Sequence, residues 1–357
     1  MMKTPIFSQF MIALAVVTAT VGARAEDRLS TQKWANDFAA SLKSKNTAQT
    51  LQLIDFEKLD KKVLNICDDC ENKEKMAKAR KLYSESKYDE ARELYSQISK
   101  KSPYWLQAVE EKAWTYFRQN QLENALAQTK TLLSPQFASY VGSESYFLQS
   151  LAQLKACNYK EVFETNKSFK EKQKTRLIEI QNLSKTGTNE AFQKVIASAE
   201  AFPMRFSDID DSANRLPALF FKDIELQRQL MRYKLAEKAL GVLNSDYSGT
   251  SSKLQASFEK TKASSLAQLQ NRMKQLASDE TNDNFKIVQK LNLVEVEAVQ
   301  RLHADVELDK NLFKKGDFNR TNAEQLVFVD DGRPWIDELD KYEVRTKACP
   351  QNIRRKM

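Results

Sequence analysis

Lys87-Tyr88-Asp89-Glu90-Ala91 is the stretch of sequence that decides the fold. An aromatic residue stands three positions before a small one, Tyr95 follows one helical turn later, and Pro103 closes the unit. The small side chain lets a facing helix approach closely, and the aromatic rings fill the space toward the neighbouring helices. The stretch therefore predicts the opening of the second helix of a helical hairpin.

The same pattern returns 34 residues later along the chain. Gln121-Leu122-Glu123-Asn124-Ala125 repeats it in a looser form, with Pro135 near the end of this second unit. A third copy at 158–162 ends in Val162, which stands 37 residues after Ala125, and the extra length falls in the loop around 139–143. Four positions match in register between the first two units: Ala79 with Ala113, Leu82 with Tyr116, Tyr88 with Leu122, and Ala91 with Ala125. Such a period predicts stacked hairpins that bury their apolar faces against their neighbours.

These units resemble the tetratricopeptide repeat, in which a small residue and an aromatic one in the first helix precede aromatic-x-x-Ala in the second. The resemblance covers residues 72–172, under a third of the chain. It implies an α-solenoid whose first helices line a protein-binding groove. It is informative about the fold and weakly informative about function, because such repeats serve many unrelated partners.

The N-terminus has the features of a secretory signal peptide. Lys3 provides a positive start, residues 6–21 are almost wholly apolar, and Ala23-Arg24-Ala25 supplies the small residues of a cleavage site. We expect cleavage after Ala25 and a periplasmic or secreted protein, with an uncleaved anchor as the alternative. No later window is apolar over the roughly 20 residues that span a bilayer, so we expect no transmembrane segment in the mature chain.

Composition favours an all-α protein. The chain has 7 glycines in 357 residues, far fewer than usual, and it is rich in Ala, Glu, Lys, Leu and Gln. We predict a helical cap on the first repeat at 26–71, the repeats at 72–186, a bundle of long antiparallel helices at 187–320 and a short extended C-terminal tail at 321–357. In the bundle we expect helices near 217–244, 251–278 and 282–313; the alternative is that irregular repeats continue. One strand-like run, residues 325–329, lies in the tail.

Apolar spacing places the helices at both ends of the repeats. Trp34, Phe38 and Leu42 share one helical face in the predicted cap. After the repeats, a long helix is expected from Tyr159 to about residue 183, with Gly187 as its stop.

The sequence contains none of the common catalytic motifs that we considered. The glycines form neither a phosphate-binding loop nor a dinucleotide motif, and His303 is the only histidine, which excludes a two-histidine zinc motif. We therefore expect no enzymatic activity, no metal and no cofactor, with His303 at the surface. Pairs of carboxylates in the loops fit solvated turns, with weak calcium binding as the alternative.

Cys67-Asp68-Asp69-Cys70 is the one motif that allows several kinds of chemistry. In an oxidising compartment we expect a local disulfide between Cys67 and Cys70. The alternatives are a zinc site with Cys157 and Cys349, and a redox-active pair. The redox reading is disfavoured because two carboxylates between the thiols would oppose a low thiol pKa. We expect Cys157 to pack inside the third hairpin.

Repeat geometry selects a binding surface. The groove-facing positions of the first helices are Lys73, Met76, Arg80 and Tyr83 in the first unit, and Glu110, Trp114, Phe117 and Arg118 in the second. Trp, Tyr and Arg are common at binding hot spots, so this surface suits a protein segment with apolar anchors and some acid. The long helix after Tyr159, or the C-terminal tail, is an alternative occupant.

The tail is itself a second candidate. Trp335, Leu339 and Tyr342 lie on an acidic amphipathic stretch, which we expect either to pack back on the bundle or to dock on a partner. With its leader, few repeats, long helices and this tail, the chain also looks like uncharacterised periplasmic repeat proteins of Gram-negative gliding or predatory bacteria.

The expected function is a scaffold or adaptor for proteins of the cell envelope. The formal net charge of +8 becomes +6 once Lys3 and Arg24 are removed with the leader. This charge and the basic stretch from Lys167 to Arg176 favour one alternative, binding of an anionic envelope polymer such as peptidoglycan or lipopolysaccharide. Export argues against nucleic acid as a partner.

Overall fold

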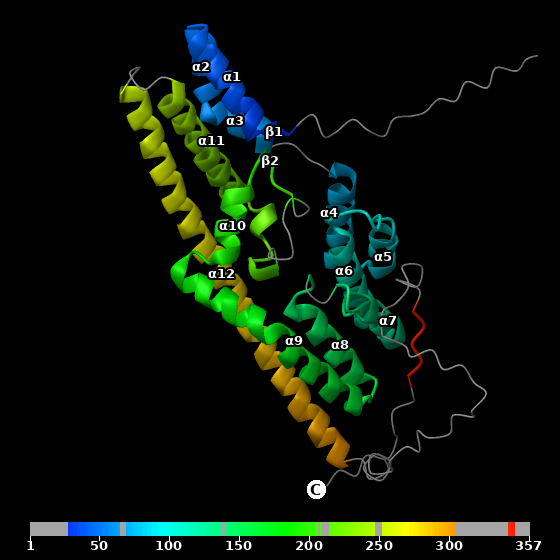
Figure 1. Cartoon of the computed structure of the whole chain (residues 1–357). Helices are drawn as coiled ribbons and strands as arrows, with labels where there is room; N and C mark the ends of the chain where they lie inside the picture. The colour runs from blue at the N-terminus through cyan, green and yellow to red at the C-terminus, as the bar shows by residue number, and fades with distance from the viewer. Residues whose placement is uncertain are drawn as a thin grey trace, which may run out of the picture.

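The computed structural model describes residues 28–64, 69–137, 140–205, 208, 214–246, 252–304 and 342–346. Over these residues the protein is all-α, as composition predicts, apart from two short strands, β1 (Leu29–Ser30) and β2 (Ala201–Phe202), which pair antiparallel (Figure 1). The signal peptide, the strand-like run at 325–329 and most of the tail are predictions that fall outside the described residues.

Six consecutive helices form three hairpins, as the repeat pattern predicts. They are α4 (Cys70–Ser84), α5 (Tyr88–Ser96), α6 (Trp105–Arg118), α7 (Leu122–Leu132), α8 (Ser143–Lys155) and α9 (Tyr159–Thr186). Each helix packs on the next, in the manner of a solenoid (Figure 1). Ala79, Ala91, Ala113 and Ala125 are all 0% exposed. The register read from the sequence therefore marks the close helix contacts.

Replacing Ala91 or Ala125 by Leu is expected to lower the free energy of unfolding by about 1–3 kcal/mol, because the added atoms have no space between the packed helices. Urea denaturation of the two variants measures this change. Unchanged unfolding midpoints for both would contradict close helix packing at these positions.

α9 runs beyond the third hairpin and joins it to a second group of helices. It ends at Gly187, which has a φ of +73°, the left-handed conformation that glycine adopts without strain. A Cβ atom here would lie 2.7 Å from the carbonyl oxygen of Gln270 in the facing helix. The predicted stop is therefore confirmed, and this glycine also permits a close helix crossing.

Two long helices follow α9 and the short helix α10 (Glu190–Ser198). They are α11 (Ile224–Asp246) and α12 (Ser252–Ala304), which pack as an antiparallel pair. The predicted separate helices at 251–278 and 282–313 are wrong, because α12 continues through residues 278–282 without a break. That stretch contains Asp and Asn, which resemble capping residues, but neither Gly nor Pro. Its Glu280 pairs with Arg176 of α9 at 2.5 Å, which holds the segment in place.

The N-terminal helices form no cap on the first hairpin of the kind we expected. α1 (Thr31–Lys43) and α3 (Phe56–Leu64) pack on α11, and α2 (Thr47–Ile54) packs on α1. Trp34 and Phe38 of α1 share one hydrophobic core with Phe258 of α12. Figure 1 shows α1–α3 beside α11, at the end of the molecule remote from α7 and α8. The prediction of a buried apolar face on α1 is confirmed. The prediction that this face packs on the first hairpin is wrong.

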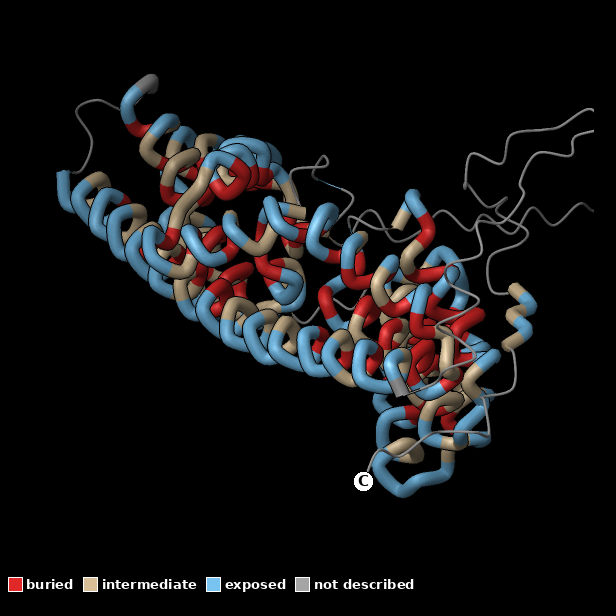
Figure 2. Tube along the Cα trace, turned by 90° about the horizontal axis from the view of Figure 1, so that it is seen from below, coloured by how far each residue is buried: buried red, intermediate tan, exposed pale blue. Residues whose placement is uncertain are grey.

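Buried residues gather in two regions, and α12 reaches both (Figure 2). One core joins α1, α10, α11 and the first half of α12. The second half of α12 lies along α8 and α9, where Val294 and Ala298 pack with Leu154 and Val162. α12 therefore covers the last hairpin of the array in the place where a further repeat would stand.

Candidate protein-binding surface

The first helices of the first two hairpins, α4 and α6, carry the predicted binding residues. Lys73, Arg80 and Arg118 are exposed, and Tyr83, Glu110, Trp114 and Phe117 are half-buried. Met76 is only 1% exposed and packs in the core of the first two hairpins, so its assignment to the binding surface is wrong. The helical spacing identified its helix face but not the depth of the contact with α6.

Aromatic and cationic side chains alternate across this surface. The Arg118 Nε donates a hydrogen bond of 3.3 Å to the Tyr83 hydroxyl oxygen, which links α6 to α4. Lys155 of α8 lies 5.0 Å from the ring centre of Phe117 in α6. In both contacts a cation of one hairpin meets the aromatic residue of the hairpin before it.

The series continues onto α12. Lys290 lies 5.4 Å from the ring centre of Phe147 in α8. We call these three contacts the aromatic–cationic ladder: Tyr83 with Arg118, Phe117 with Lys155, and Phe147 with Lys290. Sequence reasoning missed Phe147 and Lys155, although each stands 37 residues after a predicted residue of the second unit, the same offset that separates Val162 from Ala125. Lys290 lies on α12, outside the repeats, so the repeat pattern could not identify it.

Trp114 joins the steps of the ladder. Its ring lies 5.7 Å from Phe117 on the same helix and 6.2 Å from Phe147 on α8. The indole Nε1 is buried, and no described residue accepts a hydrogen bond from it. An indole N–H without an acceptor is uncommon, since Trp usually finds a partner when buried. The Trp114 side chain therefore packs beneath the surface between α6 and α8, and its N–H has no acceptor among the described residues.

Positive charge exceeds negative charge around the ladder. Arg80 forms a two-pronged ion pair with Glu111. The Glu111 carboxylate also accepts a hydrogen bond of 2.9 Å from the Tyr95 hydroxyl. Lys222 reaches across from the segment before α11 to donate to Gln107 at 3.0 Å, and its desolvation lowers its pKa. Among the described residues no carboxylate pairs with Lys73, Arg118, Lys222 or Lys290. The surface thus presents unneutralised cations beside partly exposed rings.

Glu110 is a carboxyl group with an unusual pKa at the edge of this surface. Desolvation between α6 and α8 raises its pKa from 4.5 to about 7, although the Ser145 hydroxyl donates a hydrogen bond to it. The folded protein therefore binds this proton more tightly than the unfolded chain does. The free energy of unfolding should fall, by up to about 3 kcal/mol, as the pH rises from 4.5 to about 7.

Replacing Glu110 by Gln is expected to remove that slope. The variant should match the wild type near pH 4 and exceed its free energy of unfolding by about 1–3 kcal/mol near pH 8, because no charge is then buried. Urea titrations at a series of pH values measure the difference. Parallel stability curves for the two proteins would show that this carboxyl group is not the cause.

The basic stretch from Lys167 to Arg176, in the middle of α9, is neutralised in part. Lys167 lies near Glu171, Lys170 pairs with Glu295 at 3.1 Å, and Arg176 pairs with Glu280. Two of these three contacts hold α12 against α9. This stretch therefore contributes to helix packing, which leaves fewer of its charges for an anionic polymer.

The described part of the tail lies on the second helix of the middle hairpin. Lys130 of α7 sits 4.8 Å from the Tyr342 ring, and the Thr346 hydroxyl donates to Glu123 at 3.0 Å. Trp335 and Leu339 lie outside the described residues. The placement of Tyr342 corrects the expectation that it packs on the long-helix bundle, and it leaves α4, α6 and α8 uncovered by this segment.

The described cysteines are both oxidised. Cys70 at the start of α4 and Cys157 between α8 and α9 are each disulfide-bonded. A disulfide sulfur is not a zinc ligand of the thiolate kind, so the zinc alternative for these two residues is wrong. Cys67 and Cys349 lie outside the described residues, and the pairing of Cys67 with Cys70 stays a prediction.

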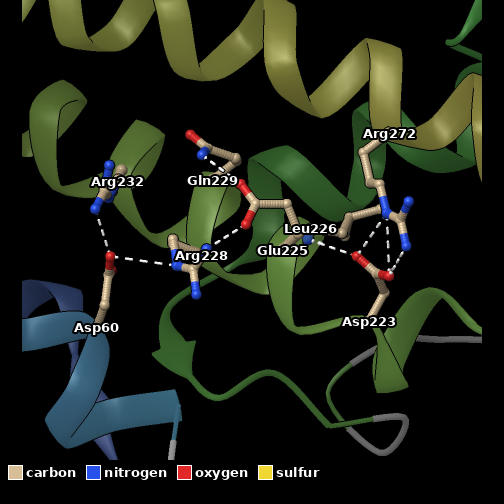
Figure 3. A network of polar contacts seen from close by, with 8 residues as sticks. All are labelled: Asp60, Asp223, Glu225, Leu226, Arg228, Gln229, Arg232 and Arg272. Atoms are coloured by element: carbon tan, nitrogen blue, oxygen red, sulfur yellow. Dashed lines mark hydrogen bonds and ion pairs between the residues drawn. The ribbon is translucent and has the colours of Figure 1, made fainter. Parts of the chain in front are cut away.

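A cluster of charged residues lies away from the ladder, between α3, α11 and α12 (Figure 3). Asp60 of α3 accepts from Arg232 at 2.5 Å and lies 3.4 Å from Arg228, both on α11. Burial raises the pKa of Asp60, against the effect of the two guanidinium groups. Farther along, Asp223 caps α11 and binds Arg272 of α12 in a two-pronged pair. Every carboxylate in the cluster is engaged, so it serves as a clamp between helices.

Comparison of the chain with protein-family models, with curated proteins and with solved structures found no match in any of the three. Within the described ranges, no three His, Cys, Asp or Glu residues are grouped so that they could hold a metal ion. None of the helices in the described part has the length and apolar character needed to cross a membrane. His303 is exposed near the end of α12, as expected.

Proposed function

We propose that this protein is a scaffold or adaptor of the cell envelope, and that it captures a segment of another protein on the surface formed by α4, α6 and α8. The proposal takes the three hairpins as tetratricopeptide repeats, an assignment that rests on the sequence period. The aromatic–cationic ladder is the observation that carries it, because partly exposed rings beside cationic side chains can hold apolar anchors and acidic groups together.

The location rests on two supports. The leader has the charge, the apolar run and the small residues of a signal peptide. Cys70 and Cys157 are disulfide-bonded, and disulfides persist in oxidising compartments such as the periplasm. Both features agree with an exported protein.

Arg118→Glu should reduce partner capture at least tenfold, because it reverses the charge at the centre of the ladder and places an acid where an acidic segment would bind. Arg118 is exposed and has no carboxylate partner among the described residues, so the melting temperature should stay within about 2 °C of the wild type. Lys172→Glu is the matched control, since this residue is exposed on α9, away from the ladder. The measurement is crosslinking and affinity capture from a periplasmic extract.

The capture experiment also separates the two functions. Protein capture that combines apolar anchors with charge should weaken only moderately when the salt concentration is raised, whereas binding of an anionic polymer should weaken strongly. Capture that is equal for Arg118→Glu and Lys172→Glu would contradict the proposed surface. Material that resists protease and is released by salt would favour the polymer.

A further inference from the structure

The chain contains four cysteines, Cys67, Cys70, Cys157 and Cys349. Cys70 and Cys157 are each disulfide-bonded, and no described cysteine is free. Four cysteines can be joined within one chain in three ways. Cys70 bonds to Cys67, to Cys157 or to Cys349, and the remaining two cysteines form the other bond. The positions of the helix ends decide between these pairings.

Cys70 and Cys157 lie at opposite ends of the hairpins. Asp69, next to Cys70 at the start of α4, accepts a hydrogen bond from Ser102 in the turn between α5 and α6. Cys157 follows α8, whose last residue lies 5.0 Å from the ring centre of Phe117, near the other end of α6. The 14 residues of α6 span about 20 Å between these two ends. Because the Cα atoms of a disulfide lie within about 7 Å of each other, Cys70 cannot bond to Cys157.

Cys67 cannot reach Cys157 either. It stands three residues before Cys70, and three residues of extended chain reach about 10 Å. The length of α6 exceeds this reach together with the Cα separation of a disulfide. The middle hairpin also lies between α4 and α8, which adds the width of a helix, about 10 Å. The pairing that remains joins Cys67 to Cys70 and Cys157 to Cys349.

The described part of the tail ends beside the hairpin end that carries Cys157. Residues 342–346 run along α7 from Lys130 toward Glu123, near the start of that helix, and Figure 1 shows this segment in red beside α7. The start of α7 adjoins the end of α6, which lies beside the end of α8. Cys349 follows the segment by three residues, a reach of about 10 Å, which is the spacing of neighbouring helices. A bond to Cys157 is therefore within reach.

We propose that a disulfide between Cys157 and Cys349 staples the C-terminal tail to the third hairpin. The other bond joins Cys67 and Cys70. Each bond forms when two thiols lose two protons and two electrons, which a protein or small-molecule disulfide accepts as it is reduced to two thiols.

The staple explains how a short extended segment keeps its place on α7. Thr346 donates hydrogen bonds to Glu123 from its backbone and its hydroxyl, and Arg345 beside it is exposed. Surface contacts of this kind hold a chain end weakly, because water competes for them and chain ends open easily. A covalent bond three residues away keeps the segment at a high local concentration beside α7. The stapled tail is thus a fixed part of the repeat array and not a free docking peptide.

The first experiment maps the bonds in the full mature chain. Protein exported to an oxidising compartment is alkylated without reduction, its monomer is isolated on a non-reducing gel, and tryptic peptides are identified by mass spectrometry. Trypsin places the cysteines in peptides 63–73, 156–160 and 348–354. Peptide 63–73 should carry an internal bond, and peptide 156–160 should be linked to 348–354. A link from 63–73 to either of the others, or alkylation of Cys157 or Cys349, would overturn the pairing.

A second experiment tests whether the bond holds the tail. In the double variant Cys157→Ser/Cys349→Ser, tryptic cleavage after the exposed Arg345 should be at least about tenfold faster than in the wild type, because the segment then leaves α7 more often. Cys67→Ser/Cys70→Ser is the matched control, since it removes the other bond, and it should be cleaved at the wild-type rate. Equal cleavage rates for the two double variants would show that no staple holds this segment.

Discussion

Phe38→Ala is expected to lower the free energy of unfolding by about 3–5 kcal/mol. Phe38 is 0% exposed, its ring stacks on Trp34 at 5.3 Å, and it meets the edge of Phe258 in α12 at 5.6 Å. The substitution removes both ring contacts and leaves a cavity between α1 and α12. Urea denaturation of the variant measures the loss.

Leu51→Ala serves as the control, because this leucine is 64% exposed and should change stability by less than about 0.5 kcal/mol. A double-mutant cycle of Phe38→Ala with Phe258→Ala should give a coupling energy of about 0.5–1.5 kcal/mol. A coupling energy near zero would contradict direct packing of α1 on α12.

The repeat register was the part of the fold most open to prediction. Ala79, Ala91 and Ala113 are small at positions where two helices nearly touch, so the constraint is local and leaves a mark in the sequence. The stop at Gly187 was also readable, because it depends on the backbone conformation of one residue. Both predictions rest on short-range geometry.

Contacts between helices that are far apart in the sequence could not be predicted in the same way. The spacing of Trp34 and Phe38 shows that one face of α1 is buried, but it does not show which of the apolar faces elsewhere in the chain lies against it. The same limit explains the missed continuity of α12. Polar residues at 278–282 look like a turn in isolation, whereas Arg176, about a hundred residues away in sequence, holds Glu280 within the helix.

The candidate surface was predicted in part for a related reason. Applying the repeat offset to the first two units placed Tyr83, Trp114 and Arg118 on one surface, and the structure connects them across α4 and α6. Met76 was misplaced because helical spacing gives the direction of a side chain but not how closely the next helix approaches it. Lys290 was missed because it comes from α12, whose place beside α8 has no signal in the repeat.

Asp60→Ala should lower the free energy of unfolding by about 3 kcal/mol. The Asp60 side chain is 8% exposed and links α3 to α11 through Arg232 and Arg228. Its loss leaves Arg232 without a carboxylate, whereas Arg228 still pairs with Glu225. The estimate lies at the lower end of the range for buried pairs, because the Arg232 side chain is 27% exposed and can regain some water.

A second substitution separates the lost charge pair from lost packing. If the unpaired Arg232 guanidinium is the main cost, replacing it by Met in the Asp60→Ala background should restore about 1–2 kcal/mol, since no buried charge then remains. Asp283→Ala is the control: its side chain is 73% exposed and its one ion pair among the described residues is with Lys286, so its loss should cost less than about 0.5 kcal/mol. Urea denaturation at pH 7 measures all the variants. Should Asp60→Ala unfold like Asp283→Ala, α3 would not be held on α11 by this clamp, and the attachment of the N-terminal helices would rest on the Phe38 core and the β1–β2 pair.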